Sequence, residues 1–122
     1  MIMKFDSSYA LDGKVFVVKI PKQLSADISE EFKDFLYDVV DSGNYRIVID
    51  LSGTEYVDSS GLGAIVSRLA YCRSLHGDIR LAYPSEFMNS LLKITHLDQV
   101  LKVYSTVEEA VNSFSSPGET GN

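Results

Sequence analysis

The sequence predicts a single α/β domain with a mixed, mainly parallel sheet, an N-terminal β-hairpin and about four helices. Three observations support this fold class. Strand-like apolar runs alternate with segments of helical apolar spacing, the chain opens with a hairpin signal, and its 122 residues suffice for one core. Right-handed crossovers that step in one direction are expected to place most helices on one face of the sheet.

The N-terminal hairpin is indicated by a turn dipeptide between two strand-like segments. Residues 2–11 read as an irregular strand and residues 14–20 as the returning strand, which Pro21 ends. Asp12 and Gly13 form the residue pair that two-residue hairpin turns favour. We therefore expect an antiparallel pair at the start of the sheet.

The first helix is predicted from about Ala26. Ser25 or Asp27 can cap its N-terminus, and Gly43 suits the left-handed position after its last turn. Apolar residues recur at helical spacing between acidic and basic ones, which predicts an amphipathic helix. The apolar face consists of Ile28, Phe32, Phe35, Leu36 and Val39.

A central strand and a second helix follow. Residues 45–51 form a near-continuous apolar run, which indicates burial on both faces as in a parallel sheet. Val48 in this run is expected to be deeply buried. The second helix is predicted from about Ser60 to Leu75, and Gly77 ends it. Its apolar face consists of Leu62, Ile65, Val66, Leu69 and Cys72.

The alternation of strands and helices continues after the second helix. Residues 78–83 are predicted to form a strand, which Pro84 terminates. Ser85 is predicted to start a third helix, because serine favours the N-cap position. The apolar face of this helix is expected to contain Phe87, Leu91 and Ile94.

The last strand and a short final helix complete the predicted domain. Residues 100–104 read as a strand, and Ser105-Thr106-Val107-Glu108 as a capping box that opens the helix. The domain is expected to span residues 1–114. Residues 115–122, rich in Ser, Pro and Gly, are expected to form a flexible tail. The apolar face of the final helix consists of Val107, Ala110, Val111 and Phe114.

Composition and charge exclude several classes of function. The net charge of −6 and pI near 4.7 argue against nucleic acid and anionic membrane surfaces as partners. No apolar run approaches the roughly 20 residues of a membrane span, and no signal peptide is evident. A single cysteine cannot form an internal disulfide, which makes the cytoplasm the expected compartment.

The most informative segment is Asp58-Ser59-Ser60-Gly61, which lies between the central strand and the second helix. Its two hydroxyl groups are expected near the free N–H groups of the first helical turn, where the side chain of Ser60 is expected to cap the helix and Ser59 to be more exposed. Locally, Asp and Ser are common N-cap residues, so a purely structural interpretation is favoured on these residues alone. Gly61 and Gly63 resemble part of a dinucleotide loop, but Val66 occupies the place of its third glycine.

The remaining reactive side chains suggest neither catalysis nor metal binding. His76 and His96 have no ligand residues at metal-binding spacing, and Cys72 lies on the apolar face of its helix. No phosphate-binding loop and no Gly-x-Ser-x-Gly motif is present in the sequence. The sequence therefore predicts no cofactor, no metal, no catalytic residue and no enzymatic activity.

The ordered part of the chain resembles the STAS-domain family of bacterial anti-sigma-factor antagonists. Residues 47–65 are similar to the family's strand–loop–helix signature. Residues 76–81 resemble the strand entry that follows it, and residues 87–97 the next helix and turn. Together with their order along the chain, these segments make the resemblance specific.

The resemblance implies a phosphorylation switch. In that family the serine directly after the motif's aspartate is phosphorylated by an anti-sigma factor with serine-kinase activity, and here that serine is Ser59. The unphosphorylated antagonist binds the anti-sigma factor, which releases the sigma factor, and a serine phosphatase restores the antagonist. The alternative is a STAS scaffold or small-ligand-sensing subunit of a larger signalling assembly. A monomer is favoured.

One departure from the family pattern concerns the segment after the second strand. The family often carries Gly-x-Leu-Asp there, whereas Lys22 and Ser25 replace the glycine and the acid in this chain. A partner that requires this carboxylate is therefore not expected. The residues expected to contact the partner are Gln23, Ser25, Asp58, Ser59, Ser60, Gly61, Leu62 and Gly63.

Overall fold

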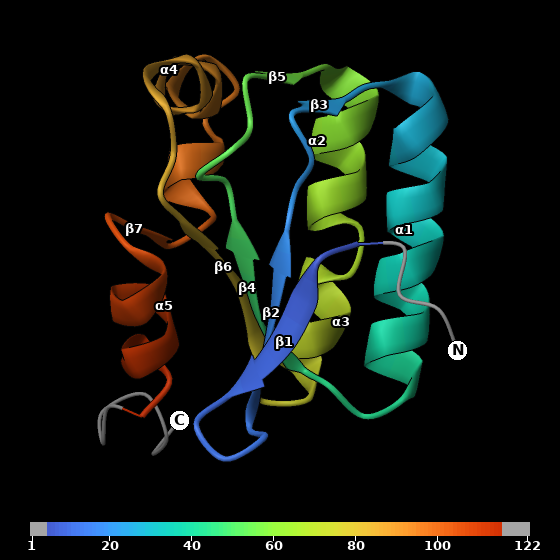
Figure 1. Ribbon diagram of the computed structural model, residues 1–122, viewed down its shortest axis with the longest axis vertical. Helices are drawn as coiled ribbons and strands as arrows, with labels where there is room; N and C mark the ends of the chain where they lie inside the picture. Colours follow the sequence, from blue (N-terminus) through green and yellow to red (C-terminus); the bar gives the residue numbers. More distant parts are fainter. Residues whose placement is uncertain (1–4, 116–122) are drawn as a thin grey trace.

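A five-stranded sheet runs through the centre of the molecule (Figure 1). The computed structural model describes residues 5–115. Strand order is β1-β2-β4-β6-β7, with β1 antiparallel to β2 and the other pairs parallel. Two short parallel strands, β3 and β5, form a separate sheet. The strands are β1 (Ser7–Ala10), β2 (Val15–Lys19), β3 (Gln23–Leu24), β4 (Arg46–Asp50), β5 (Tyr56–Val57), β6 (Asp78–Ala82) and β7 (Val103–Tyr104).

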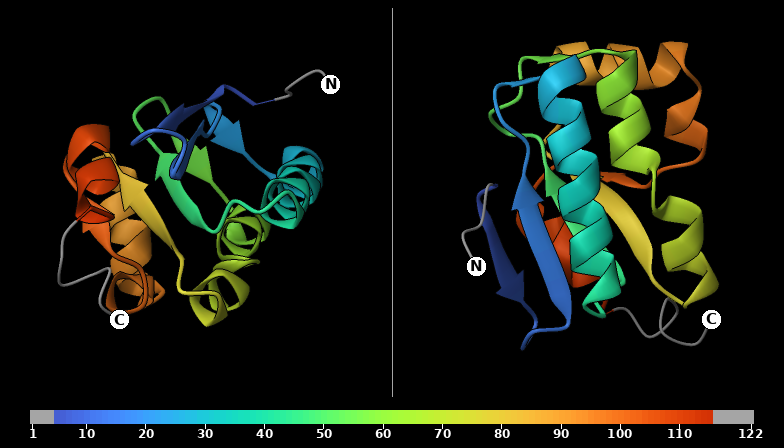
Figure 2. Two further views of the ribbon diagram at one scale, coloured as in Figure 1. Left: turned by 90° about the horizontal axis from the view of Figure 1, so that it is seen from below. Right: turned by 90° about the vertical axis from the view of Figure 1, so that its right-hand side faces the viewer.

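Helices cover both faces of this sheet. Three of them, α1, α2 and α3, pack on one face, and α5 packs on the other (Figure 2). Helix α4 lies beyond the carboxyl ends of the parallel strands, at the top of Figure 1. The predicted fold class, with most helices on one face, is confirmed. The helices are α1 (Ala26–Asp41), α2 (Ser59–Val66), α3 (Leu69–Ser74), α4 (Glu86–Ile94), α5 (Val107–Ser113) and the 3₁₀ helix η1 (Leu97–Gln99).

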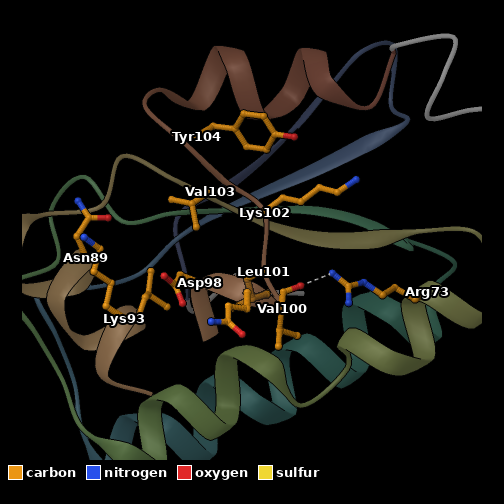
Figure 3. Close-up of a pocket in the computed structure, with 11 residues that line it drawn as sticks. Arg73, Asn89, Lys93, Asp98, Val100, Leu101, Lys102, Val103 and Tyr104 are labelled. Carbon is orange, nitrogen blue, oxygen red and sulfur yellow. Dashed lines mark hydrogen bonds between the residues drawn. The ribbon is translucent and has the colours of Figure 1, made fainter. Parts of the chain in front are cut away.

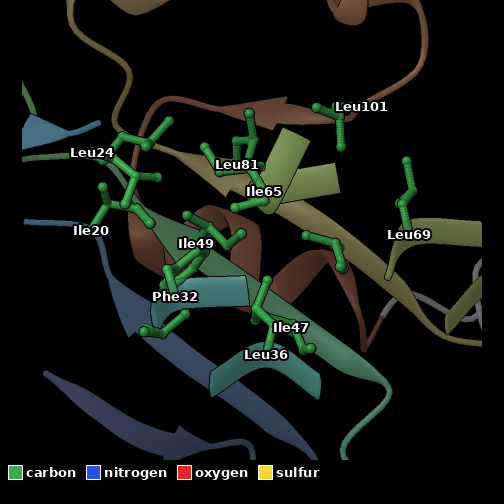
Figure 4. Close-up of a cluster of buried hydrophobic side chains, with 14 of the residues drawn as sticks. Ile20, Leu24, Phe32, Leu36, Ile47, Ile49, Ile65, Leu69, Leu81 and Leu101 are labelled. Atoms are coloured by element: carbon green, nitrogen blue, oxygen red, sulfur yellow. The ribbon is translucent and has the colours of Figure 1, made fainter. Parts of the chain in front are cut away.

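Alternating side chains of the central strand β4 pack into two separate cores on opposite faces of the sheet. Ile47 and Ile49 point into the larger core beneath α1, α2 and α3, part of which Figure 4 shows. Val48 points to the opposite face, where α5 covers a smaller core. This two-sided burial explains the continuous apolar run of the strand. The smaller core consists of Val15, Val48, Ala82, Ala110, Val111 and Phe114.

Val48→Ala is expected to lower the free energy of unfolding by about 1–3 kcal/mol, because burial is lost and a cavity remains. The Val48 side chain is fully buried in the smaller core. Chemical denaturation of the variant and the wild-type protein measures the difference. An unchanged denaturation midpoint would contradict the central position of β4.

The hairpin forms where it was predicted, but its first strand is shorter. Regular pairing covers only Ser7–Ala10, and residues 2–4 of the predicted strand lie outside the described residues. The turn includes Asp12 and Gly13 with positive φ angles of 56° and 82°, as this turn dipeptide requires. Leu11 also has a positive φ, so the connection is wider than two residues.

The predicted second helix is two helices, because the chain breaks at Ser67 and Arg68. The hydroxyl of Ser67 donates to the carbonyl of Ala64 at 2.8 Å, a local bond that competes with regular helix. The Arg68 guanidinium lies over the rings of Tyr37 and Tyr71, at 4.3 and 4.1 Å from their centroids. The apolar face continues across this break, so periodicity alone predicted one helix.

The third helix starts at its predicted cap but packs through a different face. Ser85 accepts a hydrogen bond from the Met88 N–H, which confirms it as the N-cap. Phe87 and Ile94, expected inside, are 39% and 76% exposed, whereas Met88 and Leu92 are buried. Leu91, also predicted on the apolar face, is partly buried and packs against the larger core.

The C-terminal elements differ in their boundaries. The last strand begins at Val103, because the Leu101 N–H donates to the Leu97 carbonyl in the η1 turn. Thr106, one residue after the predicted Ser105, caps α5 by accepting from the Glu109 N–H at 3.1 Å. Beyond residue 115 the predicted tail lies outside the described residues. The domain boundary after residue 114 stays a prediction.

The end of α3 also differs from the prediction. His76, not Gly77, takes the left-handed conformation after the helix, with a φ of 65°. Gly77 instead lies against the backbone of Tyr45, where any side chain would overlap the Tyr45 carbonyl. Gly43 after α1 has a φ of 101°, as predicted.

Candidate functional site

The Asp58–Gly63 segment lies where the carboxyl ends of the parallel strands meet the start of a helix. The chain leaves β4 at Asp50, forms the short strand β5, and enters α2 at Ser59. Ser59 is exposed, and its hydroxyl makes no hydrogen bond to another described residue. The junction therefore presents, at the N-terminus of α2, an exposed hydroxyl that is not engaged by another described residue.

Asp58 is the N-cap of α2. Its Oδ1 accepts hydrogen bonds from the Ser60 hydroxyl at 2.6 Å and from the Gly61 N–H at 2.9 Å. These two bonds, with smaller contributions from the backbone N–H groups of Ser60 and Ala26, lower the pKa of Asp58. The carboxylate is therefore ionised at neutral pH and interacts with the N-termini of both α1 and α2.

Ser60 has a different role from the one predicted. We expected its side chain to cap the helix, but the cap is Asp58, whose carboxylate oxygen reaches the Gly61 N–H. The Ser60 hydroxyl instead donates to that carboxylate and lies 3.3 Å from Ser29 Oγ. Although Ser60 is also exposed, its hydroxyl is committed to a charge-assisted hydrogen bond.

The β3–β5 pair brings Gln23 and Ser25 to the same junction. Gln23 pairs with Tyr56, and the Leu24 carbonyl accepts from the Asp58 N–H at 3.3 Å. Ser25 occupies the N-cap position of α1 without a side-chain capping bond. The predicted contact residues, although distant in sequence, therefore form one continuous region.

The predicted contact residues in α2 differ in accessibility. Gly61 and Leu62 are buried beneath the surface, whereas Gly63 is exposed. A Cβ at Gly61 would overlap the Leu24 carbonyl oxygen and lie 2.7 Å from Val57 Cγ1. Gly61 thus allows the first turn of α2 to pack against β3.

Gly61→Ala and Gly63→Ala are expected to change stability in opposite directions. The methyl group at Gly61 forces the backbone of α2 or β3 to move, which costs about 1–3 kcal/mol. A methyl at Gly63 meets nothing within 4 Å, and alanine favours an exposed helix by up to about 1 kcal/mol. Thermal unfolding of the two variants measures the difference. Equal melting temperatures would contradict the close packing at Gly61.

Two features of this region were not predicted. Ser29 lies beneath Ser60, and its hydroxyl donates to the Ser25 carbonyl at 2.8 Å. Tyr56 and Phe87 stack with ring centroids 5.7 Å apart, and both are partly exposed beside the junction. Neither feature has a signal in local periodicity, because both depend on how α1 and α4 approach the α2 junction.

The remaining reactive groups offer little chemistry. Burial raises the pKa of the Cys72 thiol to about 11, so the thiol stays neutral, in line with its predicted role as a small buried apolar residue. Among residues 5–115, no group of three or more His, Cys, Asp or Glu side chains could hold a metal ion. None of the helices in this range is long and apolar enough to span a bilayer.

The fold and the junction define a small α/β domain that presents a serine at a helix N-terminus. The chain belongs to the STAS-domain family, whose sequence profile it matches over residues 9–110. A candidate anti-sigma factor antagonist of Thermotoga neapolitana is 33% identical over 104 residues, covering 84% of this chain and 92% of that protein. The family relationship to anti-sigma-factor antagonists is therefore established.

Solved structures agree with this assignment. The crystal structure of a candidate anti-sigma factor antagonist of Thermotoga maritima superposes with a TM-score of 0.83 at 30% identity, covering 92% of this chain and 95% of that one. The unphosphorylated anti-sigma factor antagonist SpoIIAA has a TM-score of 0.78 at 18% identity, covering 91% and 96% of the two chains. The SpoIIAA comparison shows a shared fold.

Proposed function

We propose that this protein is a phosphorylation-controlled anti-sigma-factor antagonist. In its unphosphorylated form it binds an anti-sigma factor with serine-kinase activity and thereby releases a sigma factor. Phosphorylation of Ser59 ends this binding, and a serine phosphatase restores it. The protein acts in the cytoplasm as a binding partner and not as an enzyme.

The observation that carries the proposal is the unequal state of the two adjacent serines. The Ser60 hydroxyl donates to Asp58 at 2.6 Å, whereas the Ser59 hydroxyl is exposed and not bonded to another described residue. Extraction of Ser60 into a kinase active site breaks a charge-assisted hydrogen bond, and extraction of Ser59 does not. These contacts support Ser59 as the phosphoacceptor.

The phosphoryl transfer itself requires little from this chain. The Ser59 oxygen attacks the γ-phosphorus of ATP held by the kinase, loses its proton to a kinase base, and ADP leaves. In the reverse branch, water attacks the phosphoserine phosphorus on the phosphatase, and inorganic phosphate leaves while the serine regains a proton. This chain supplies an accessible hydroxyl on a rigid junction, which Gly61 and the β3–β5 pair hold in place.

Several neighbours of Ser59 support a partner-binding face. Gln23 and Tyr56 are exposed next to each other on β3 and β5. Lys22 and Glu55 form an exposed ion pair at 3.8 Å, which contributes little to stability and leaves both charges accessible. Ser25, in the position of the family's acid, offers an uncharged hydroxyl, so we expect a partner that does not require a carboxylate there.

Incubation with the cognate kinase and ATP is expected to place phosphate on Ser59 alone. Peptide mapping by mass spectrometry locates the phosphate, and Ser59→Ala should abolish labelling. Ser74→Ala, at an exposed serine of α3, is the matched control and should leave labelling unchanged. Phosphate on Ser60 in the wild-type protein, or full labelling of Ser59→Ala, would contradict the proposal.

A further inference from the structure

A hollow of about 560 Å³ lies beside β7 (Figure 3), and no residue of the Asp58–Gly63 segment lines it. Its volume is in the range of ligand-binding pockets. Val100 and Val103 contribute apolar surface, and Arg73, Lys93 and Lys102 contribute charge. A second hollow of about 370 Å³ shares Asn89, Val103 and Tyr104 with the first, so the depression continues along the strand.

Strand β7 is an edge of the sheet with an open side. Its inner side pairs with β6: the Leu81 N–H donates to the Lys102 carbonyl and the Tyr83 N–H to the Tyr104 carbonyl, both at 3.0 Å. In a parallel ladder the backbone groups of successive residues face opposite sides of the strand. Val103 lies between Lys102 and Tyr104, so its N–H and C=O face outward. No strand among residues 5–115 pairs with this outer side.

The charge around this edge is opposite to that of the whole chain. The first hollow is lined by three basic side chains and a single acidic one, Asp98, whereas the chain carries a net charge of −6. Arg73 is fixed at one end of the hollow, where its Nη2 donates to the Val100 carbonyl at 2.7 Å (Figure 3). Its partner Asp78 is shared with Arg80, so one carboxylate faces two guanidinium groups.

We propose that the outer edge of β7 is a docking site for an extended acidic peptide segment of a protein partner. The peptide adds as a strand beside Val103, with main-chain hydrogen bonds to the outward N–H and C=O. Because side chains of a strand alternate, apolar ones on one face lie against the exposed Val100 side chain, while acidic ones reach Arg73 and Lys102. This site is separate from the Ser59 junction and does not depend on the proposed switch.

Two blocked hexapeptides test the proposal on the ¹⁵N-labelled full chain. One alternates valine and glutamate, and the other alternates valine and lysine. The glutamate peptide is expected to shift the backbone amide signals of Val103 and its neighbours in a saturable titration, and the lysine peptide is not. Lys102→Glu is expected to lower the affinity for the glutamate peptide at least about tenfold, because the substitution places like charges together.

Matched controls separate strand addition from simple charge attraction. Lys14→Glu, an equal charge reversal in the hairpin turn, should change the affinity less than about twofold, since exposed charges far apart are screened. Val103→Pro removes the outward N–H without removing a bond to β6, and N-methylation of the peptide removes its donors. Both changes should abolish binding of the glutamate peptide. N-methylation of the peptide tests this on the wild-type protein, without a substitution that could disturb folding.

Three results would overturn the proposal. They are the absence of shifts with the glutamate peptide, equal binding of the N-methylated peptide, and the same shifts with free glutamate at equal concentration. The last result would identify a site for small anions instead of a strand.

Discussion

Ser59→Asp is expected to lose at least a hundredfold in affinity for the anti-sigma factor, while its circular dichroism spectrum and melting temperature stay near those of the wild type. The binding loss has a direct electrostatic cause. Placing an unpaired charge into a desolvated contact costs several kcal/mol, and about 3 kcal/mol already exceeds a hundredfold in affinity. Isothermal titration calorimetry with the purified partner measures the effect.

The fold should tolerate the same charge. Ser59 is exposed in the first turn of α2, where the helix dipole favours a negative group by about 0.3–1 kcal/mol. Repulsion from the neighbouring Asp58 carboxylate is of similar size in water and opposes that gain. We therefore expect the phosphorylated state to differ from the unphosphorylated one in local charge and bulk, without global rearrangement.

Two variants sharpen this experiment. Ser59→Ala removes the phosphoacceptor without adding charge and should bind as tightly as the wild type. Ser74→Asp adds the same charge at an exposed position of α3 and should also bind normally. A Ser59→Asp protein that unfolds, or one that binds like the wild type, would rule out a switch by local charge.

Asp78→Ala is expected to lower the free energy of unfolding by about 3 kcal/mol or more. Asp78 is 5% exposed, and its carboxylate contacts two guanidinium groups, Arg73 Nε at 2.9 Å and Arg80 Nε at 3.0 Å. Arg80 is itself 3% exposed and lies 4.1 Å from the centroid of the Phe114 ring. Removal of the carboxylate takes away the anion that lies 3.0 Å from this buried guanidinium.

A double variant distinguishes buried charge from lost packing. Arg80→Met in the Asp78→Ala background removes the buried charge and keeps most of the side-chain volume, so it should restore part of the lost stability. Urea denaturation of the wild type, the single variant and the double variant measures the recovery. Equal stability of Asp78→Ala and the wild type would show that this network contributes little.

Elements with a clear period could be predicted from the sequence, and short elements could not. The apolar run around Val48 and the amphipathic spacing of α1 are long enough for burial to determine their type. Strands β3 and β5 contain two residues each and have no period to detect. They exist because the Lys22 and Leu24 carbonyls meet the N–H groups that precede α2.

The position of the strand–helix junction could be predicted from the sequence, but its internal contacts could not. The motif at Asp58–Gly61 predicted an exposed strand–helix junction. Asp58 rather than Ser60 is the cap because its carboxylate oxygen accepts from the Gly61 N–H. One hydrogen bond decides this, and both residue types favour the position. The contact between Ser60 and Ser29 depends on the approach of α1 to α2, which no local pattern encodes.

The strand order has a consequence for the kinetics of folding. Along the larger sheet, each strand pairs with the next one along the chain, from β1 through β2, β4 and β6 to β7. Every crossover therefore closes a loop between successive strands, and no pairing must wait for the two ends of the chain to meet. Because folding slows as paired residues become more distant in sequence, this domain should fold faster than a β-sandwich of equal length. The sheet can grow outward from β4, with the edge strands joining last.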